Sequence, residues 1–563
     1  MKNKTGNLIT SAKDMCSLLN DFFSSVFTHE DTNARLPKVE QVFKGDQENM
    51  LLDIDITEEI VLRNLKKMKP NKAPGVDGFG SQLFRELAEN ISLPLCKIFR
   101  KSLVDGLVPL DWKKANVTAI YKAGSRKDPC NYRPISLTTQ ACKIMESILK
   151  DAITEHLHRF NLVRNTQHGF VKNRSCLTNL LSFLEFVRDY VDKGVPIDVI
   201  YLDFKKAFDK VPHHRLMVKV RALGIDGPIA KWIENWLENR TQRVVINGQS
   251  SDWEKVISGV PQGSVLGPLL FIIYVNDLEN KVANKLLKFA DDTKVFGLVA
   301  NESEVASLRQ DLKSLCNWSE DWMMLFNVEK CRVMHFGYNN QNCKYSLNNN
   351  ELCTVSEEKD LGVIVQSDLK VSSQCAKVVK TANQILGMIK RSFTSRNKEI
   401  ILNLYKTLVR PHLEYGVQAW RPYLKKDIDL IERVQHRATK IIDGLKDLSY
   451  EQRLSKLNLT MLETRRLRGD LIEVFKMLKG CEDVNYQDFF IMSISHLRGH
   501  ELKLYKKSFK TNVGKFSFSN RVVEIWNKLP NDVVSSSTVT CFKIKIDQLI
   551  KNDWGFNQKP IKI

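Results

Sequence analysis

Two adjacent carboxylates between short apolar segments constrain this chain most strongly. The segment from Lys288 to Val295 reads KFADDTKV, which places Asp291 and Asp292 at the predicted tip of a short β-hairpin. A third carboxylate, Asp203, follows the run VIYL, a pattern typical of a buried strand. A fold that satisfies both patterns needs a sheet in which these strand ends lie side by side.

Three carboxylates on neighbouring strand ends can hold two divalent cations about 3.5 to 4 Å apart, which is the arrangement that clamps the attacking and leaving oxygens in phosphoryl transfer. Each site also has an ordinary structural interpretation. Asp203 could cap a helix that begins near Lys205, because Asp is a favoured N-cap residue. Asp291 and Asp292 could form a solvated turn. The occurrence of both sites in one chain favours the chemistry of a nucleic-acid polymerase.

A loop rich in glycine and proline lies between the two sites. It reads SGVPQGSVLGP from Ser258 to Pro268 and precedes an apolar stretch that predicts a short buried helix. Gly263 would let the backbone approach a ligand closely, and the amide of Gln262 could bond to a sugar or base. The alternative is an ordinary Gly-Pro turn before a buried helix.

Composition agrees with a polyanionic partner. The chain has 563 residues, 43% of them hydrophobic, which is enough for several subdomains with cores of their own. Its formal net charge of +20 favours a nucleic acid as the partner, bound through counterion release. The twelve cysteines form no C-x-x-C pair, so we expect reduced thiols inside a cell. No apolar run is long enough for a membrane span, and we expect no membrane association.

The pattern along the chain predicts an α+β fold. An amphipathic helix is expected over residues 10–28, and helical and strand patterns alternate up to about residue 370. Residues 374–480 are helical and basic, with predicted helices at Ile401 to Arg410 and Ile428 to Ile442. Two further helices are expected at Asn520 to Leu529 and Val539 to Lys551.

These motifs together resemble those of a known family. The segment from Phe289 to Asp292, Asp203 with Phe208 downstream, and the Pro-Gln-Gly of residues 261–263 resemble the catalytic motifs of reverse transcriptases, in the same order. The similarity extends over nearly the whole chain to the reverse transcriptases of non-LTR retrotransposons, in particular the jockey-like group. It implies a right-hand polymerase, with the boundaries N-terminal helix and connector 1–53, fingers 54–195, palm 196–373, helical thumb 374–480 and C-terminal extension 481–563.

The resemblance also implies a metal site. Asp203, Asp291 and Asp292 match the metal-binding aspartates, and the backbone carbonyl of Phe204 matches an additional ligand. Two Mg²⁺ ions are the implied cofactors, with Mn²⁺ as a substitute. Lys330 resembles a lysine that protonates the departing pyrophosphate, although a surface lysine after a turn is the ordinary alternative.

The nucleotide site follows from the same resemblance. Phe208 matches the aromatic that packs under the incoming sugar, and Gln262 and Gly263 line that pocket. Arg133 corresponds to a residue that contacts the triphosphate, with Lys122 as its companion. The implied partners are an RNA template, a DNA primer and deoxynucleoside triphosphates.

Three expectations complete the sequence interpretation. Complete elements of this type carry an endonuclease before the polymerase, and this chain begins in what resembles the connector between the two, so we expect no nicking activity. The protein is expected in the cytoplasm and nucleus. A catalytically silent nucleic-acid-binding relic and a maturase-like RNA-binding protein are the rival functions.

Overall fold

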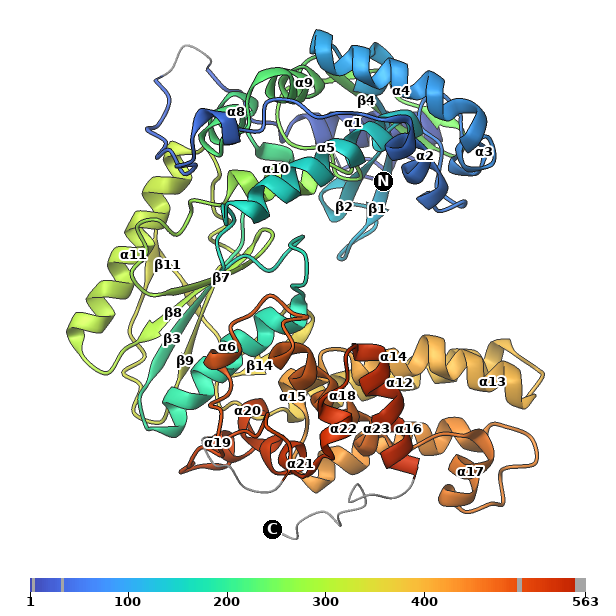
Figure 1. The fold of residues 1–563 in the computed structure, drawn as a ribbon, viewed down its shortest axis with the longest axis vertical. Coiled ribbons are helices and arrows are strands. Elements are labelled where there is room, and N and C mark those ends of the chain that lie inside the picture. The colour runs from blue at the N-terminus through green and yellow to red at the C-terminus, as the bar shows by residue number, and fades with distance from the viewer. Residues whose placement is uncertain (3–5, 32–34, 494–498, 552–563) are drawn as a thin grey trace.

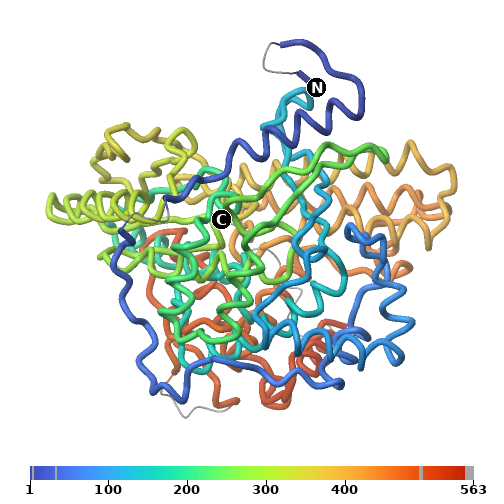
Figure 2. The backbone as a smooth tube through the Cα atoms, turned by 90° about the horizontal axis from the view of Figure 1, so that it is seen from above, coloured from blue at the N-terminus to red at the C-terminus, as the bar shows by residue number. Residues whose placement is uncertain are grey.

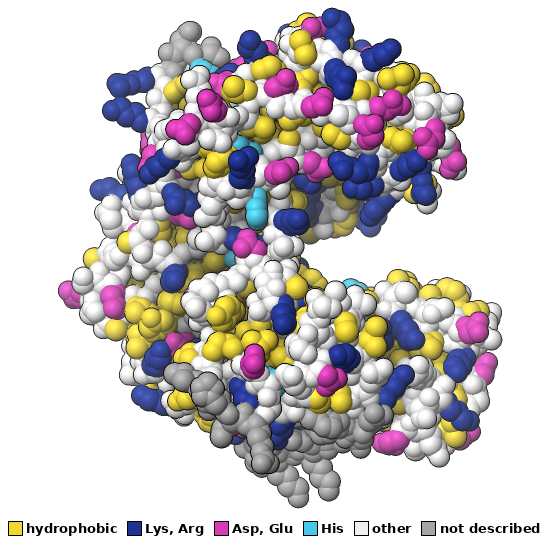
Figure 3. Space-filling model, viewed as in Figure 1, with side chains coloured by type: hydrophobic (Ala, Val, Ile, Leu, Met, Phe, Trp, Pro, Cys, Tyr) yellow, Lys and Arg dark blue, Asp and Glu magenta, His cyan; other side chains and the backbone are white. Residues whose placement is uncertain are grey.

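The computed structural model describes residues 1–2, 6–31, 35–493 and 499–551. Its mixture of helices and sheets confirms the predicted α+β class. An upper lobe, built mainly from residues 35–162 and 207–282, and a lower lobe of residues 372–551 are joined on one side by a central sheet (Figure 1). The space-filling view shows a deep cleft between the two lobes, which opens on the side opposite this sheet (Figure 3).

The upper lobe contains its own sheet. Strand β1 (Lys114–Tyr121) pairs antiparallel with β2 (Tyr132–Leu137) and parallel with β4 (Arg240–Ile246). Strand β4 pairs in turn with β5 (Gln249–Ser250) and β6 (Glu254–Val256). The end of the β1–β2 hairpin points into the space between the lobes (Figure 1).

Helix α1 (Ala12–Ser24) covers part of this upper sheet. Its buried residues Cys16, Leu19 and Phe23 fall on one helical face and pack on Val117 and Val244. The amphipathic helix predicted for residues 10–28 is therefore confirmed, although it ends earlier, at Ser24.

The described residues between α1 and α2, 25–31 and 35–57, run along the outside of the molecule, as the view from above shows (Figure 2). They are anchored at Val42 and Phe43, whose backbone N–H groups both donate to Ala222 O at 3.1 Å. The Phe43 ring also packs against His156 and Phe160. This segment therefore contributes to the core of the upper lobe.

Helices fill the rest of the upper lobe. Helix α10 (Gly267–Tyr274) confirms the predicted short buried helix, because all its residues from Leu269 to Tyr274 are buried. No helix in the described part of the chain has the length and apolarity of a membrane span. The other helices of this lobe are α2 (Glu58–Lys67), α3 (Ser81–Glu86), α4 (Ala88–Asp105), α5 (Gln140–Arg159), α7 (Ala207–Lys210), α8 (His213–Ala222) and α9 (Gly227–Leu237).

The central sheet has the strand order β12-β9-β3-β8-β7. Both faces of its middle strand, β3 (Ile197–Leu202), are buried: Val199 belongs to the apolar cluster that includes helix α6 (Cys176–Asp192), and Ile200 to the cluster that includes helix α11 (Glu302–Asp321). The strand also carries a buried carboxylate, Asp198, which accepts from Tyr345 Oη at 2.7 Å. The two helices flank the sheet in Figure 1. The other strands are β7 (Lys285–Phe289), β8 (Asp292–Leu298), β9 (Arg332–Phe336) and β12 (Cys353–Thr354).

Two small hairpins flank β12, the last strand of the central sheet, along the chain. Strands β10 (Ser346–Leu347) and β11 (Asn350–Glu351) form one, and β13 (Glu357–Asp360) and β14 (Val363–Gln366) form the other. Helix α12 (Ser372–Ser392) then begins the lower lobe.

The lower lobe is helical, as predicted. The first predicted helix is split into α13 (Lys398–Leu404), a π-helical turn (Tyr405–Val409) and α14 (Arg410–Glu414), and the second is α16 (Lys425–Lys440). Helix α23 (Val539–Lys551) has the predicted bounds. The helix predicted from Asn520 is instead two short helices. The remaining elements are α15 (Val417–Trp420), α17 (Tyr450–Leu457), α18 (Leu462–Leu478), α19 (Asn512–Lys515), α20 (Phe518–Arg521), α21 (Val523–Lys528) and α22 (Asn531–Val534).

Candidate active site

The adjacent aspartates lie at the tip of a β-hairpin, as predicted. Phe289 pairs with Asp292 in the β7–β8 register, so Ala290 and Asp291 form a two-residue loop. The favoured two-residue turns require a positive φ at their first residue, and Ala290 has φ +56°. The turn therefore projects Asp291 beyond the end of the sheet, and Asp292 is the first residue of β8.

Asp203 lies beside this tip. It directly follows β3, and Leu202 of β3 pairs with Thr293 of β8, so the two strand ends are adjacent. The alternative that Asp203 caps a helix is wrong, because the helix begins later, at Ala207, with Lys206 as its N-cap. The chain instead turns through Lys206 in the left-handed region, at φ +51°, before α7.

The backbone after Asp203 is held by the segment that follows α11. Asn327 N donates to Asp203 O at 2.7 Å, and Lys205 N donates to Leu325 O at 2.9 Å. These two bonds flank the bridge between Phe204 and Phe326. In such a pair the N–H and C=O of Phe204 itself point away from the partner strand. The Phe204 carbonyl, predicted as a metal ligand, is thus not used in this pairing.

Burial raises the pKa of both carboxyl groups at the hairpin tip. For Asp291 the negative charge of Asp203 adds to this effect, and the positive charge of Arg133 opposes it. The pKa of Asp292 is raised to about 6 by burial and then by the charges of Asp291 and Asp360. The site thus concentrates negative charge that the protein only partly compensates.

The donor types at this site fit a divalent cation. Carboxylate oxygens are the ligands that Mg²⁺ and Mn²⁺ prefer, and a bound cation would stabilise the ionised forms of Asp291 and Asp292, which burial and neighbouring negative charges disfavour. Among the residues that the structure describes, no three acidic, histidine or cysteine side chains converge closely enough to surround one ion. The three aspartates are therefore neighbours in this conformation and do not form a closed coordination shell.

Cationic side chains lie near the aspartates. Lys330 Nζ is 3.2 Å from Asp203 Oδ2, and both residues line a cavity of 350 Å³ together with Asp292. The end of the upper hairpin carries Lys122 and Arg133. The pKa of Lys122 is lowered by burial and by the positive charges of Arg133 and Lys330. The structure thus brings all three predicted cationic residues to one region.

Phe208 lies on α7 at the edge of the upper lobe. Its ring stacks on Phe271 of α10 with centroids 4.4 Å apart, and Phe170 meets it edge-on at 6.4 Å. Phe208 is only partly buried, whereas Phe271 is fully buried beneath it. One face of Phe208 is therefore covered by the core.

Gln262 and Gly263 pack tightly between α7 and β2. Gln262 Nε2 donates to Asp209 Oδ1 at 2.9 Å, and Ser136 N donates to Gln262 O at 2.7 Å. Gly263 has φ +110°, and a Cβ at this position would lie 2.5 Å from Ser136 O. Only glycine fits there, for reasons of both conformation and space. Gly263 is solvent-exposed, but its backbone approaches β2 closely, and this contact requires a glycine.

Asp209 is a site residue that the sequence interpretation missed. Burial raises its pKa to about 6, and the hydrogen bond from Gln262 opposes this effect. Asp209 fixes the orientation of the Gln262 amide. In the sequence, the indication of a role for Asp209 is its position directly after Phe208.

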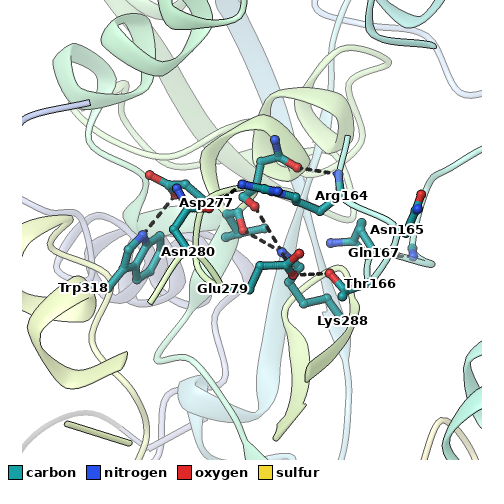
Figure 4. A network of polar contacts seen from close by, with 12 residues as sticks. Arg164, Asn165, Thr166, Gln167, Asp277, Glu279, Asn280, Lys288 and Trp318 are labelled. Carbon is teal, nitrogen blue, oxygen red and sulfur yellow. Dashed lines mark hydrogen bonds and ion pairs between the residues drawn. The ribbon is translucent and has the colours of Figure 1, made fainter. Parts of the chain in front are cut away.

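A polar network behind the hairpin was also missed (Figure 4). Lys288 of β7 is fully buried, and its Nζ lies 3.1 Å from Glu279 Oε2. Thr166 Oγ1 donates to the same carboxylate, and Asp277 nearby accepts from Trp318 Nε1 at 3.0 Å. Burial lowers the pKa of Lys288, and Glu279 opposes this effect. The network attaches β7 to the upper lobe.

The segment 164–169 borders the outer edge of β7. Lys288 N donates to Thr166 O at 2.8 Å, and His168 N donates to Lys288 O at 2.9 Å. Gln167 Oε1 accepts from Ala290 N at 2.9 Å and from Gly169 N at 2.8 Å. A Cβ on Gly169 would lie 2.3 Å from Ala290 N. This segment therefore supports the turn that carries Asp291.

Comparison with known proteins agrees with this geometry. Residues 120–374 match the family model "Reverse transcriptase (RNA-dependent DNA polymerase)". The RNA-directed DNA polymerase from mobile element jockey of Drosophila melanogaster is 27% identical over 405 residues, which are 69% of this chain and 44% of the relative. The probable RNA-directed DNA polymerase from transposon X-element of the same species is 26% identical over 433 residues, which are 73% of this chain and 47% of the relative.

Another similarity covers a shorter part of the chain. The Pol polyprotein from type-1 retrotransposable element R2 of Popillia japonica is 27% identical over 255 residues, 45% of this chain and 33% of that protein. The chain spans less than half the length of these curated relatives.

Proposed function

We propose that this chain is an RNA-directed DNA polymerase that extends a DNA primer on an RNA template. Residues 120–374 match the reverse transcriptase family model, and the chain is similar to the polymerases of non-LTR retrotransposons. One observation carries this proposal: Asp203, Asp291 and Asp292 lie on adjacent strand ends, opposite the cationic end of the upper hairpin. Negative metal-ligating groups and positive phosphate-binding groups thus border the same space.

In this proposal the protein has the parts of a right hand. The fingers (residues 54–195) supply much of the upper lobe, the palm (196–373) contains the central sheet, and the thumb (374–480) begins the lower lobe. The cleft between the lobes would hold the hybrid of template and primer (Figure 3). The net charge of +20 supports binding of such a polyanion.

The aspartates would hold the divalent cations of the reaction, Mg²⁺ or Mn²⁺. When bound, such cations lower the pKa of the primer 3′-hydroxyl and neutralise the charge of the departing pyrophosphate. Asp203 and Asp291 would supply the direct ligands, with Asp292 and the Phe204 carbonyl as further oxygen donors. The negative charges of Asp291, Asp360 and Asp203, which add to the effect of burial on the pKa of Asp292, favour a cation there.

The surrounding residues would position the nucleotide. Arg133 and Lys122 would bind the triphosphate, because guanidinium and ammonium groups donate several hydrogen bonds to phosphate oxygens. Phe208 would lie against the sugar, and Gln262, oriented by Asp209, would border the same pocket. Lys330 would donate a proton to the leaving pyrophosphate. Most of the rate enhancement would come from such positioning and from electrostatic stabilisation.

Primer extension tests this proposal directly. Purified protein should extend a DNA primer on a defined RNA template with deoxynucleotides, and only when Mg²⁺ or Mn²⁺ is present. Asp203→Asn and Asp291→Asn should abolish extension while primer–template binding, measured by fluorescence anisotropy, is retained. Asp252→Asn is a matched control, because the Asp252 side chain is 97% exposed and pairs with Lys13 on the surface.

The outcome also separates the rival functions. A wild-type protein that binds the hybrid but never extends the primer would be a silent nucleic-acid-binding relic. Full extension by Asp291→Asn would refute the assignment of the site, even if the activity itself is present.

A further inference from the structure

Residues beyond 480 dock on helix α6, which flanks the central sheet. Two buried carboxylates of α6 receive their backbone N–H groups. Asp192 accepts from Thr511 N at 2.7 Å and Lys510 N at 3.0 Å. Glu185 accepts from Phe518 N at 2.8 Å. Because a buried carboxylate without hydrogen bonds is strongly unfavourable, these bonds fix the C-terminal segment to α6.

A third contact of the C-terminal segment lies at the opposite end of α6. Asp483 accepts from Arg174, which precedes the helix: Arg174 Nη2 lies 2.8 Å from Asp483 Oδ2, and Arg174 Nε donates to the same oxygen at 2.9 Å. Arg174 Nε also contacts Asp483 O at 3.0 Å. The Arg174 side chain is 5% exposed and that of Asp483 is 54% exposed. The guanidinium is thus buried, and Asp483 covers it from the solvent side.

The other donors of Arg174 hold the turn that borders β7. Nη1 donates to Asn165 O at 2.7 Å and to Gln167 O at 2.9 Å, and Nη2 donates to Asn165 Oδ1 at 3.0 Å. A guanidinium has five N–H donors in a fixed planar arrangement. With one edge bound to Asp483, the remaining donors can satisfy these carbonyl groups in one orientation only.

The segment around Gln167 also holds the β7–β8 hairpin. The Gln167 carbonyl is fixed by Arg174, and the Gln167 side chain accepts the N–H of Ala290, the residue before Asp291. A continuous series of hydrogen bonds therefore leads from Asp483 through Arg174 and Gln167 to the loop that carries Asp291.

We propose that Asp483, Arg174 and Gln167 are positioning residues, through which the C-terminal segment holds Asp291 in its catalytic position. This inference rests on the proposed polymerase function. It assigns to the segment after residue 480 an indirect contribution to the chemical step, besides its contribution to the lower-lobe core.

The test uses the full chain and separates turnover from binding. Asp483→Ala should lower kcat for single-nucleotide addition about 10-fold, as is usual for partners that orient metal ligands. The Kd for the primer–template hybrid should not change. Asp483→Asn keeps an acceptor for Arg174 and should recover part of the rate. Asp547→Ala is the matched control: it removes a bidentate ion pair with Arg468, and Asp547 is 47% exposed, but it lies on α23, away from the hairpin.

Two further measurements show whether Asp483 acts through Gln167. In a Gln167→Met background, Asp483→Ala should cause little additional loss of kcat, since the connection is already broken. Hydrogen exchange of the peptide that contains Ala290 should be faster in Asp483→Ala than in wild type and unchanged in Asp547→Ala. This exchange measurement needs no activity, so it decides the inference if Gln167→Met does not fold.

Three results would overturn the inference: an unchanged kcat in Asp483→Ala, an equal loss in Asp547→Ala, or unchanged exchange at Ala290. If the wild-type protein extends no primer, the proposed function fails, and the exchange rates still show whether Asp483 holds the hairpin.

Discussion

Lys330 Nζ lies 3.2 Å from Asp203 Oδ2. The ammonium group of Lys330 is thus paired with a carboxylate that we expect to bind a metal ion. The two side chains are 57% and 33% exposed. Ion pairs this exposed contribute less than about 1 kcal/mol, because water screens them and ordering the side chains costs entropy. Lys330 can therefore leave Asp203 when a stronger cation or a phosphate arrives.

This relationship gives a prediction for Lys330→Gln. If Lys330 protonates the pyrophosphate, the single-turnover rate at saturating nucleotide and metal should fall about 100-fold, the usual contribution of a general acid. Lys330→Arg keeps the charge but is a much poorer proton donor, so it should be similarly slow. A lysine that only screens Asp203 would behave differently: its loss would lower the Mg²⁺ concentration needed and leave the saturated rate intact.

A second prediction concerns the stability of Asp292→Asn. The pKa of Asp292 in the folded protein is about 6, above its value of about 3.9 in an unfolded chain. Ionisation of Asp292 is therefore unfavourable to folding above pH 6, and this cost disappears as pH falls toward 4. In metal-free buffer at pH 8 the variant should be more stable than wild type, by on the order of 1 kcal/mol because Asp292 is partly exposed to solvent.

Urea denaturation in the presence of a chelator, at pH 8 and at pH 5, measures this difference. The advantage of Asp292→Asn should shrink at the lower pH. If Asp292→Asn is less stable than wild type at pH 8, the ionised carboxylate of Asp292 stabilises the folded protein and the prediction is wrong.

A third prediction concerns sugar selection by Phe208. If its ring lies beneath the 2′ carbon of the incoming nucleotide, a 2′-hydroxyl would overpack the site at a cost of about 1 to 3 kcal/mol. Such a term supports roughly 5- to 150-fold discrimination against ribonucleotides. Phe208→Val should lose this discrimination, measured as the ratio of kcat/KM for the two sugars. Phe296→Val, which truncates a buried ring of the central sheet, should lower stability and leave the ratio intact. An unchanged ratio in folded, active Phe208→Val would make Phe208 a core aromatic only.

A fourth prediction compares two glycines with positive φ. Gly263→Ala would place a Cβ 2.5 Å from the backbone oxygen of Ser136, whereas Gly248 has φ +79° and no atom within 4 Å of such a Cβ. Both substitutions strain the backbone, but only Gly263→Ala adds a steric clash. It should therefore cost about 1 to 3 kcal/mol more in unfolding free energy. It should also raise the KM for deoxynucleotides. Equal effects of the two substitutions would mean that the Gln262 loop can shift away from β2.

The residues of the candidate site that lie at strand ends could be predicted from the sequence. Asp203, Asp291 and Asp292 could be predicted as neighbours, because each lies next to a short apolar strand whose pattern is local. The same local reasoning suggested a helix cap at Asp203, and this was wrong, because the chain first turns through Lys206 before any helix begins. Local preference for a cap could not foresee that turn.

The supporting residues could not be predicted in this way. Arg174 and Asp483 are 309 positions apart in the sequence, and nothing in either local pattern indicates the other. Asp209 and Gln262 pair only because α7 and the loop before α10 pack together. Such contacts depend on tertiary packing, whereas strand and helix patterns depend on neighbours along the chain.

The buried Lys288 has a consequence for how the catalytic loop is specified. Side chains alternate along a strand, so a shift of β7 by one residue against β8 would turn Lys288 away from Glu279 and bring an apolar neighbour in its place. Glu279 would then be a largely buried charge without its cation, which is strongly unfavourable. The same shift would move Asp291 out of the loop. The amino group of Lys288 takes no part in the chemistry, but it helps to fix the β7–β8 register and thereby the position of Asp291 in the loop.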